Sequence, residues 1–468
     1  MTSTSSPSLD LRSGIGRLAT GQPAEPATTA AARREPATGE ARYAALITRF
    51  RPVFDRIAAG SLAREQSRNL PFEQVGWLKD AGFTALRVPA EHGGDPVSAE
   101  HLFRLLIELA AVDSNVAHLL RSHFAFGETA ALQPAAFRER WFPRILAGQL
   151  FGNAATERSG NALGTTSTTL RQQDGQWLLH GEKYYTTGSI FADWVVVMAS
   201  TAGVQGRQYA VVPADAPQVR IVDDWDGFGQ PLTGTGTAVF DDVPVDAGNI
   251  LQRQVTSTLE PAFFQLFLLA VLAGIGRAAL HDTAALVQTR TRTFNTGSGE
   301  LFRNDPLIQE HVGQLAAKVY AAEAVVTAAA RDLDAAADPS LNLSPEQAFL
   351  RAELAVQQAH VVVPGLVLDA ASALFDVTGA SAVSRGKGLD RHWRNARTVA
   401  THNPSAFKAR SVGDYFVNGT IPTGLHSIGD APSPPVSAAA APPPSSAASP
   451  VPSPSTTSPA PSTAGAAS

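Results

Sequence analysis

Three stretches of this chain carry the side chains best suited to chemistry. Residues 389–404 concentrate Arg, His, Trp and Asn where a plain surface helix would carry Glu and Lys, and they include His402. Residues 152–160 and 181–189 are rich in Gly, Ser and Thr. Small residues let main-chain donors approach a flat heterocycle, and short hydroxyls can bond its edge. Imidazole suits proton transfer because it titrates near neutral pH. Taken alone, such loops are also typical of ordinary capped turns.

Several other kinds of active site lack their motifs in this sequence. There is no cysteine in 468 residues, which excludes disulfides, thiolate catalysis and Cys-ligated metals. We find no Gly-x-Gly-x-x-Gly after a strand, no Gly-x-x-x-x-Gly-Lys, no His-Glu-x-x-His and no Gly-x-Ser-x-Gly. His118 and His123 are five residues apart, a poor helical spacing for one metal ion. We therefore predict no metal site and no binding of NADH by this chain.

Composition limits the partners and the compartment. The net charge is only −5 and no Lys/Arg block is present, so nucleic acid is not expected as a partner. The most apolar run, residues 262–275, is interrupted by Gln265 and is shorter than the roughly 20 residues that span a bilayer. We expect it to form a buried core helix. Residues 1–40 lack the apolar stretch of a secretory signal, so we expect a cytoplasmic protein with no membrane partner.

The chain divides into five stretches by composition and period. Residues 1–40 and 426–468 are predicted to be disordered, because Ala, Pro and Ser residues bury too little apolar surface to offset an ordering entropy of about 1–2 kcal/mol per residue. Apolar residues recur at helical spacing in residues 41–150 and 256–425. Residues 151–255 show short strands between Gly, Asp and Pro. We predict an α+β fold with an N-terminal helical domain, a small central β-barrel or sandwich and a C-terminal four-helix bundle.

This order of elements resembles the acyl-CoA dehydrogenase superfamily, from about residue 42 to residue 422. Residues 389–404 resemble the last active-site segment of its flavin-dependent monooxygenase branch, which includes the dibenzothiophene and dimethylsulfone-type sulfur monooxygenases. The resemblance implies an acyl-CoA dehydrogenase-like fold and a homotetramer, with flavin sites completed across subunit boundaries.

The resemblance also implies a set of site residues. Residues 152–160 look like the loop that meets the flavin ring, and residues 181–189 look like the flavin-facing strand, with Thr187 near flavin N5. Arg290 and Arg292 match a helix end that reaches a flavin phosphate, although a solvated helix end explains them equally well. The cofactor-binding residues implied are Asn153, Thr156, Ser159, Tyr185, Thr186, Thr187, Arg290, Arg292 and Ser381.

The catalytic residues implied by the resemblance surround the flavin. They are His123, Asn153, Thr187 and His402. In the monooxygenase branch, a histidine at the position of His123 faces the substrate side of the flavin. The branch usually carries two histidines three residues apart in its last segment, and this chain has Val399 in place of the first.

A missing base separates the two activities of the family. An acyl-CoA dehydrogenase needs a carboxylate that removes a proton alpha to a thioester. Counting back from Arg394, the usual position of this glutamate falls on Gly386. Some members carry it on an earlier helix, here near Gln265, where Glu260 is the only nearby acid. Losing a general base typically costs about 10²–10⁴-fold in rate, so oxygenase chemistry is favoured.

The resemblance therefore implies a two-component monooxygenase. A separate NAD(P)H:flavin reductase would supply FMNH2, and O2 would react through a C4a-hydroperoxyflavin to oxygenate a small organic substrate at sulfur, nitrogen or carbon. An FAD-dependent acyl-CoA dehydrogenase with a displaced base is one alternative. A non-catalytic structural homologue is the other.

Overall fold

A computed structural model gives the conformation of most of the chain. The chain divides into two compact units, residues 1–46 and 47–468. Helix α1 (Glu40–Ala58) begins in the first unit and continues into the second, and everything below concerns the second unit. The predicted disordered stretches fall almost wholly outside the described residues. The structure describes residues 39–158, 166–204, 208–252, 258–298 and 301–422.

The first part of the second unit is helical. Side-chain caps separate its helices: Ser98 Oγ accepts from the backbone N–H of His101 over 3.1 Å, and Asp113 Oδ1 accepts from that of Asn115 over 3.1 Å. Asp113 therefore ends one helix and starts the next. The helices are α2 (Ser61–Ser67), α3 (Phe72–Asp80), α4 (Ala99–Val112), α5 (Ser114–Leu119), α6 (Arg121–Ala131) and α7 (Ala135–Leu146).

Two four-stranded sheets form the central part. One has the order β1-β4-β5-β8, with β1 parallel to β4, and the other is an antiparallel sheet of order β2-β3-β7-β6. Buried apolar residues from both sheets form one cluster, so the sheets pack face to face as a small sandwich. The strands are β1 (Phe151–Ala154), β2 (Thr169–Gln173), β3 (Gln176–Lys183), β4 (Trp194–Ala199), β5 (Gln208–Pro213), β6 (Val219–Ile221), β7 (Ala238–Val245) and β8 (Ile250–Gln252).

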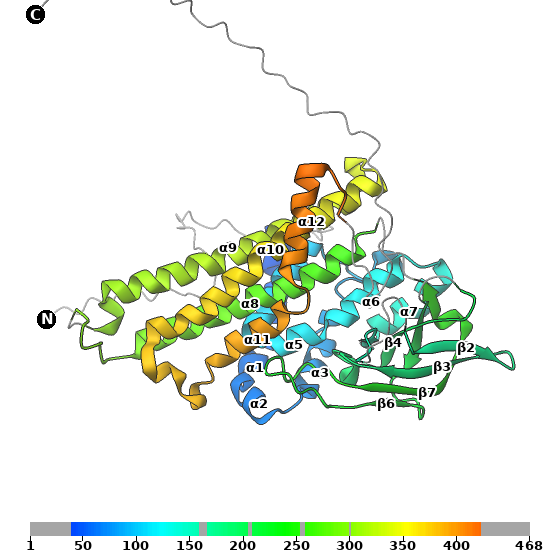
Figure 1. Ribbon diagram of the computed structural model, residues 1–468, viewed down its shortest axis with the longest axis horizontal. Helices are drawn as coiled ribbons and strands as arrows, with labels where there is room; N and C mark the ends of the chain where they lie inside the picture. Colours follow the sequence, from blue (N-terminus) through cyan, green and yellow to red (C-terminus); the bar gives the residue numbers. More distant parts are fainter. Residues whose placement is uncertain (1–38, 159–165, 205–207, 253–257, 299–300, 423–468) are drawn as a thin grey trace, which may run out of the picture. The chain divides into compact units, whose positions relative to one another are not determined.

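Long helices form the C-terminal part. Figure 1 shows α8, α9 and α10 running along one another, with the strands gathered beyond one end of them. Every residue of α8 from Glu260 to Gly276 is buried. At Gly274 a Cβ would lie 2.4 Å from the Cβ of Ala110, so glycine allows α8 to approach α4 closely. The helices are α8 (Glu260–Thr289), α9 (Pro306–Ala337), α10 (Pro345–Thr378), α11 (Asp390–Ala400) and α12 (Ser405–Asn418).

Short 3-10 helices join these elements. They are η1 (Phe83–Ala85), η2 (Ala90–His92), η3 (Ser189–Phe191), η4 (Ala247–Asn249), η5 (Phe302–Asn304), η6 (Pro339–Leu341), η7 (Gly379–Val383) and η8 (Arg385–Lys387). Together the elements confirm the predicted α+β architecture of helical domain, small β domain and helical bundle.

Among the described residues, two helices are long and apolar enough to cross a membrane by length and composition alone. They are Glu260–Thr289 and Pro345–Val383, and 83% and 44% of their most apolar windows are buried inside the protein. The first contains the apolar run that the sequence predicts to be a core helix, and its burial confirms that prediction.

Candidate functional site

Thr187 lies in the turn that follows β3, and two unusual backbone conformations shape that turn. Tyr185 has a φ of 60° and Gly188 a φ of 84°. A Cβ at Gly188 would lie 2.3 Å from the carbonyl oxygen of Leu119, so glycine lets the turn rest on the end of α5. Ser122, in the first turn of α6, donates from Oγ to the carbonyl oxygen of Thr187 over 3.1 Å. Thr187 is thereby held at the junction of α5 and α6.

The hydroxyl of Thr187 begins a chain of hydroxyl groups. Its Oγ1 lies 2.8 Å from Oγ1 of Thr235, which in turn lies 2.8 Å from Oγ1 of Thr233. Thr233 donates to the backbone carbonyl oxygen of Gln230 over 3.1 Å. Thr233 and Thr235 are buried, whereas Thr187 is half-buried. The accessible end of the chain is therefore a hydroxyl whose hydrogen bonding is set from inside the protein.

Neighbouring residues of this turn point in different directions. Thr186 is fully buried, and its Oγ1 donates to the carbonyl oxygen of Gly236 over 2.9 Å. This hydroxyl is used inside the β domain, so its placement does not support the expectation that the Thr186 side chain lies beside a flavin. The ring of Tyr185 is 49% exposed, and its centroid lies 6.1 Å from that of Trp225. Tyr185 therefore has an open aromatic surface for a flat ligand.

Asn153 and Thr156 lie where β1 passes into the following loop. Ser189 donates from Oγ to the carbonyl oxygen of Asn153 over 3.1 Å, and the backbone N–H of Tyr184 donates to the carbonyl oxygen of Thr156 over 2.8 Å. These bonds tie the loop to the turn after β3. Both side chains are half-buried, and the Asn153 amide has no hydrogen-bond partner within the part of the chain that is described. Ser159, predicted to join them, lies outside the described residues.

A buried ion pair holds the same loop. Lys183 is 1% exposed and donates from Nζ to Oε1 of Glu157 and to Oγ1 of Thr166, each over 2.8 Å. The backbone N–H groups of Ser167 and Thr168 also donate to the Glu157 carboxylate, over 2.8 and 2.9 Å. Burial opposes ionisation, but these donors outweigh it and lower the pKa of Glu157 far below its ordinary value. Glu157 is thus a structural anion and a poor base.

His402 lies in the loop between α11 and α12, where amide groups hold it. Nδ2 of Asn403 lies 2.9 Å from Nδ1 of His402 and donates to Oε1 of Gln265 on α8 over 2.8 Å. From the other side, Nε2 of His360 on α10 donates to the carbonyl oxygen of Asn403 over 2.9 Å. The loop is therefore fastened to two helices of the bundle, and among the described residues the imidazole of His402 is hydrogen-bonded at Nδ1 alone.

The imidazole of His402 is accessible and yet surrounded by protein. The residue has exposed surface, but burial is the largest cause that holds its pKa well below the ordinary value. The charges of Arg121, His118 and His360 lower the pKa further, and no carboxylate of the described residues figures among its charged neighbours. His402 is therefore neutral at pH 7.

Helices α5 and α6 bring the turn after β3 and the His402 loop together. Arg121, which precedes the serine bonded to that turn, donates from Nε to the carbonyl oxygen of Phe264 over 3.1 Å. Phe264 is the residue before Gln265 in the sequence. On α5, Nδ1 of His118 lies 2.9 Å from Oε1 of Gln230. The sequence prediction includes neither Arg121 nor His118 among the site residues, and the one available signal was a polar side chain beside apolar helical residues.

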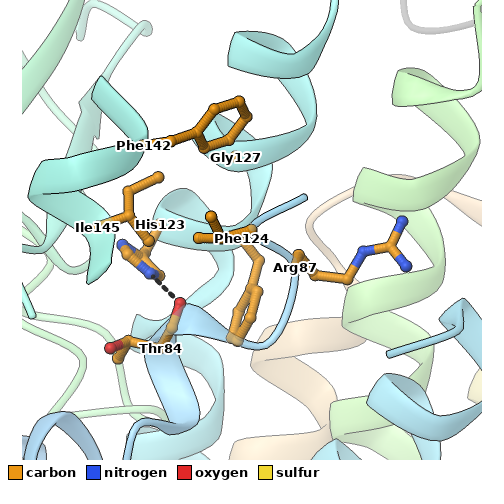
Figure 2. Close-up of a pocket in the computed structure, with 8 residues that line it drawn as sticks. Thr84, Arg87, His123, Phe124, Gly127, Phe142 and Ile145 are labelled. Carbon is orange, nitrogen blue, oxygen red and sulfur yellow. Dashed lines mark hydrogen bonds between the residues drawn. The ribbon is translucent and has the colours of Figure 1, made fainter. Parts of the chain in front are cut away.

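His123 points away from this site. Its Nε2 donates to the carbonyl oxygen of Thr84 over 2.8 Å, its ring stacks on Phe151 at 6.0 Å, and Figure 2 shows it beside a small cavity that Phe142 and Ile145 also line. The residue is 2% exposed, and burial lowers the pKa of His123 to about 4. Packing between η1, α6 and α7 accounts for this histidine, and the placement does not support its expected role on the substrate side of a flavin.

Arg290, Arg292 and Ser381 gather at the opposite end of α8. Nη1 of Arg290 donates to the carbonyl oxygen of Thr378 over 2.6 Å, and Oγ of Ser381 lies 3.4 Å from the same oxygen. Arg292 is exposed. Most of the 30-residue helix α8 separates Gln265 from Arg290, a span of about 37 Å at ~1.5 Å per residue. This span is longer than an FMN molecule. Within one chain, the residues around Gln265 and the arginine cluster at Arg290 therefore cannot hold the same cofactor.

The structure changes the argument about a catalytic base. Gly386 lies in η8 against α2, where its carbonyl oxygen accepts from Nε2 of Gln66 at 3.5 Å, whereas His402 is held against α8 and α10. Gly386 therefore does not mark the position beside His402. Glu260, the nearby acid on α8, accepts a hydrogen bond from Thr129 on α6. Within the described part of the chain, the side chain bonded to the imidazole of His402 is the amide of Asn403, and no carboxylate is among its charged neighbours.

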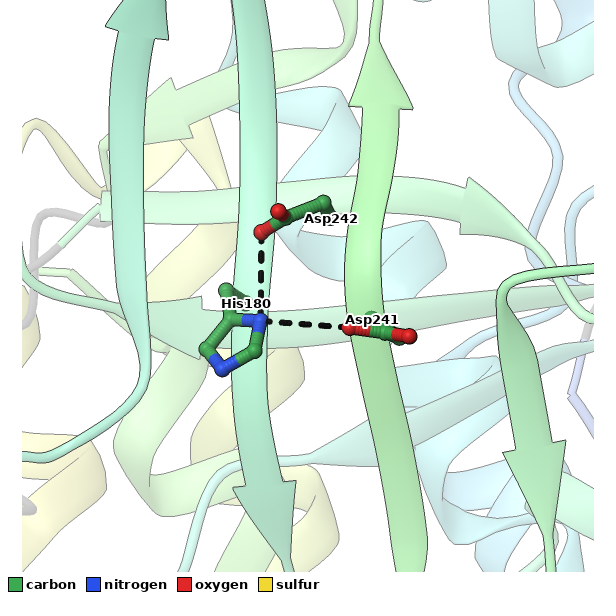
Figure 3. A group of neighbouring side chains, drawn as sticks. All are labelled: His180, Asp241 and Asp242. Carbon is green, nitrogen blue, oxygen red and sulfur yellow. Dashed lines mark ion pairs between the residues drawn. The ribbon is translucent and has the colours of Figure 1, made fainter.

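One group of possible metal ligands lies on the surface of the β domain. Figure 3 shows His180 on β3 facing Asp241 and Asp242 on β7, with Nδ1 at 3.6 and 3.1 Å from their carboxylate oxygens. Asp242 also pairs with Nη2 of Arg171 at 2.8 Å. All of these side chains are at least 41% exposed. Mutual pairing accounts for the group, which gives no reason to propose a metal site.

Models of the acyl-CoA dehydrogenase family match three consecutive stretches of the chain. The N-terminal domain model matches residues 49–149, the middle domain model residues 152–243 and the C-terminal domain model residues 266–406. Together these matches cover well over half of the chain.

Individual relatives extend the likeness. The chain is 27% identical over 382 residues to a "probable FMNH2-dependent monooxygenase", SfnC of Pseudomonas putida, across 80% of this chain and 94% of SfnC. It is 27% identical over 388 residues to the dibenzothiophene monooxygenase of Mycolicibacterium goodii, across 79% of this chain and 91% of that enzyme. The crystal structure of FMN-bound TdsC from Paenibacillus sp. A11-2 superposes with a TM-score of 0.74 at 28% identity, covering 81% of this chain and 98% of TdsC.

Proposed function

Because this chain belongs to the acyl-CoA dehydrogenase family, and the relatives described above are named as monooxygenases, one of them as a probable FMNH2-dependent monooxygenase, we propose that it is an FMNH2-dependent monooxygenase. It takes reduced FMN from a separate NAD(P)H:flavin reductase and uses O2 to oxygenate a small organic substrate. Organosulfur compounds are the first class to consider, since its relatives are named for them. The observation that carries this proposal is the setting of His402: the Asn403 amide meets its ring, and no carboxylate of the described residues is among the charged groups that act on it.

The lack of a suitable base among the described residues around His402 argues against the dehydrogenase alternative. Removal of a proton alpha to a thioester needs a positioned general base whose pKa lies near the working pH. Asn403 and Gln265 carry no basic group, and the pKa of His402 is held well below its ordinary value, which makes its imidazole a weak base. Glu157 is committed to Lys183 and also has a lowered pKa. An oxygenase needs no such base.

The polar and aromatic groups at the turn after β3 fit a flavin ring. Bound reduced FMN supplies the two electrons with which O2 is activated. Thr187 and Asn153 offer an accessible hydroxyl and an amide without a described partner, which suit the polar edge of the ring, and Tyr185 offers an open aromatic face. The backbone of Thr156 and Thr186 shapes this surface. Both residues also adjoin the ring through the main chain in this proposal.

His402 serves as a neutral hydrogen-bond donor in this site. Its pKa lies below the ordinary value because of burial and the positive charge of Arg121, so at pH 7 it adds no charged acid to the cavity. A neutral imidazole still carries one N–H group. Asn403 engages Nδ1, which leaves Nε2 to meet a polar atom of the reacting groups. A site without mobile acids restrains the proton leakage that would divert reducing equivalents to hydrogen peroxide.

The phosphate of FMN is bound by a second copy of the chain in this proposal. Arg290 and Arg292 offer guanidinium groups suited to phosphate, but α8 holds them about 37 Å from Gln265. Symmetric assembly brings such distant groups of two copies together. Helix α12 supports assembly, because none of its residues is buried and Phe407 and Phe416 are 69% and 67% exposed. We propose the homotetramer that the family resemblance implies.

The cofactor supply also suggests the compartment. A reductase that uses NAD(P)H works where these nucleotides are held, and a chain without cysteine has no thiol or disulfide that would report on the redox state of its surroundings. We propose a cytoplasmic location, with neither nucleic acid nor membrane as a partner.

An isotope experiment tests the activity. Chemically reduced FMN, the protein and dibenzothiophene are mixed without oxygen, and 18O2 is then admitted. We expect by mass spectrometry one 18O atom in the sulfoxide and two in the sulfone, with one FMNH2 consumed for each atom inserted. A panel of amines and indoles extends the assay to nitrogen and carbon oxygenation.

Other results would identify the alternatives. Purification with stoichiometric FAD that is bleached by an acyl-CoA, together with no 18O in any product, would establish the dehydrogenase. No binding of FMN in either redox state would point to a non-catalytic homologue. Each of these results contradicts the monooxygenase proposal.

A further inference from the structure

The threonine chain beside the turn after β3 has a fixed direction. Each hydroxyl has one hydrogen to donate and lone pairs that accept. The backbone carbonyl of Gln230 can only accept, so the hydrogen of Thr233 is used on it at 3.1 Å. Thr235, at 2.8 Å, must then donate to Thr233, and Thr187, also at 2.8 Å, must donate to Thr235. The carbonyl at the inner end thus determines the role of the hydroxyl at the outer end.

Burial protects this direction. Thr233 is 1% and Thr235 5% exposed, so water does not replace a partner that turns away. Reversal of the chain would leave the carbonyl of Gln230 without its donor in a buried place, where an unmade hydrogen bond is costly. Hydrogen bonds in series also polarise one another, which favours a single direction along the whole chain.

The hydroxyl of Thr187 is consequently an acceptor toward the open side of the site. Its only hydrogen is held by Thr235, and its remaining lone pairs point elsewhere. A ligand group that meets Thr187 from the open side is favoured if it carries a hydrogen. A group that presents only a lone pair is disfavoured, because neither partner can donate.

We propose that Thr233 and Thr235 make Thr187 a selector for reduced over oxidised FMN. This inference rests on the proposed function and on the family resemblance, which implies that Thr187 lies near flavin N5. N5 carries a hydrogen in reduced flavin and only a lone pair in oxidised flavin. The reduced form therefore donates to Thr187, while the oxidised form meets an oxygen with no hydrogen to offer.

Such selection suits an enzyme that does not reduce its own flavin. After each turnover the bound flavin is oxidised and must be exchanged for FMNH2 from the reductase. A site that favours the reduced form by one hydrogen bond discriminates by about threefold to tenfold. Discrimination of this size keeps oxidised FMN from occupying the site between turnovers.

The substitution Thr235→Val tests the proposal, because valine keeps the shape of threonine and removes its hydroxyl. Thr187 then regains a free hydrogen that can point to N5 of oxidised FMN. We expect oxidised FMN to bind about threefold to tenfold more tightly than to the unmodified protein, measured by quenching of FMN fluorescence. Thr235→Ser is the matched control, since it keeps the hydroxyl, and the affinity for oxidised FMN should stay unchanged.

Two further measurements make the result decisive. Thr233→Val breaks the chain one link further in and should change the affinity for oxidised FMN in the same direction, which covers a Thr235→Val protein that fails to fold. Anaerobic titration gives the affinity for reduced FMN, which should not tighten in either variant. If both redox forms bind but their affinity ratio is the same in all variants, the selector is refuted while the proposed function stands. If neither form binds the unmodified protein, both are refuted.

Discussion

His123 gives the sharpest test of the structure, because the sequence resemblance places it at the flavin and the structure buries it elsewhere. We predict that His123→Gln leaves oxygenation and hydrogen peroxide release unchanged and alters only the dependence of stability on pH. Glutamine can still donate from its amide to the carbonyl oxygen of Thr84, which His123 Nε2 contacts at 2.8 Å. It cannot take up a proton at mildly acidic pH.

The size of the effect follows from the pKa of His123. Burial lowers this pKa to about 4 in the folded protein, against about 6.5 for an unfolded histidine. Below pH 6.5 the unfolded chain therefore binds a proton that the folded chain refuses, so the free energy of unfolding falls as the pH falls. At ~1.36 kcal/mol per pKa unit the loss reaches about 3 kcal/mol near pH 4, and it is absent above pH 7.

Urea unfolding at several pH values between 7.5 and 4.5 measures this directly. The unmodified protein should lose about 2–3 kcal/mol more than His123→Gln over this range. His311→Gln, at an exposed position on α9, is the matched control and should follow the unmodified protein. Parallel stability curves for His123→Gln and the unmodified protein would show that His123 is not a buried neutral imidazole. Loss of oxygenation in a stably folded His123→Gln protein would instead restore it to the flavin site.

Three further substitutions test other parts of the site. Asn403→Asp sets a carboxylate about 3–4 Å from the ring of His402 and should raise the pKa of His402 by about 1 to 3. His402 then becomes charged at a higher pH, so hydrogen peroxide release should begin to rise at a higher pH as the pH is lowered. An unchanged pH profile of peroxide release would contradict the contact. Arg292→Gln should weaken FMN binding about tenfold and leave the binding of riboflavin, which lacks the phosphate, unchanged; equal loss for both would exclude a phosphate contact. Lys183→Met leaves the Glu157 carboxylate buried without its cation and should lower the free energy of unfolding by about 3–5 kcal/mol. The double variant with Glu157→Gln should lose much less, and equal losses would show that the pair is not coupled.

The architecture was predictable from the sequence because the hydrophobic period changes sharply between helix and strand. Residues 262–275 were correctly predicted to form a core helix, since an apolar run of that length in a soluble domain must be buried. The turn after β3 was also predictable in outline. The burial of the Thr186 side chain was not predictable. A left-handed conformation at Tyr185 changes which side chains face the core, and a tyrosine at that position does not indicate such a conformation.

The position of His123 shows why the direction of a helical side chain is hard to predict from sequence. His118 and His123 are near neighbours in the chain, but α5 ends at Leu119 and α6 begins at Arg121, so the helical phase is interrupted between them. His118 acts on the electrostatics of His402, while His123 bonds Thr84 on the other side. The contact of Asn403 with Gln265 joins residues 138 positions apart, and nothing local in either segment indicates it.

The length of α8 ties cofactor retention to protein concentration. If each FMN bridges a hydroxyl-bearing pocket in one copy and arginines in another, the free energy with which FMN strengthens association equals the free energy with which association strengthens FMN binding. Dilution of the protein would then separate the subunits and release FMN while each chain stays folded. Added FMN would protect the oligomer against dissociation. Ligand and neighbouring subunit would thus act as reciprocal effectors.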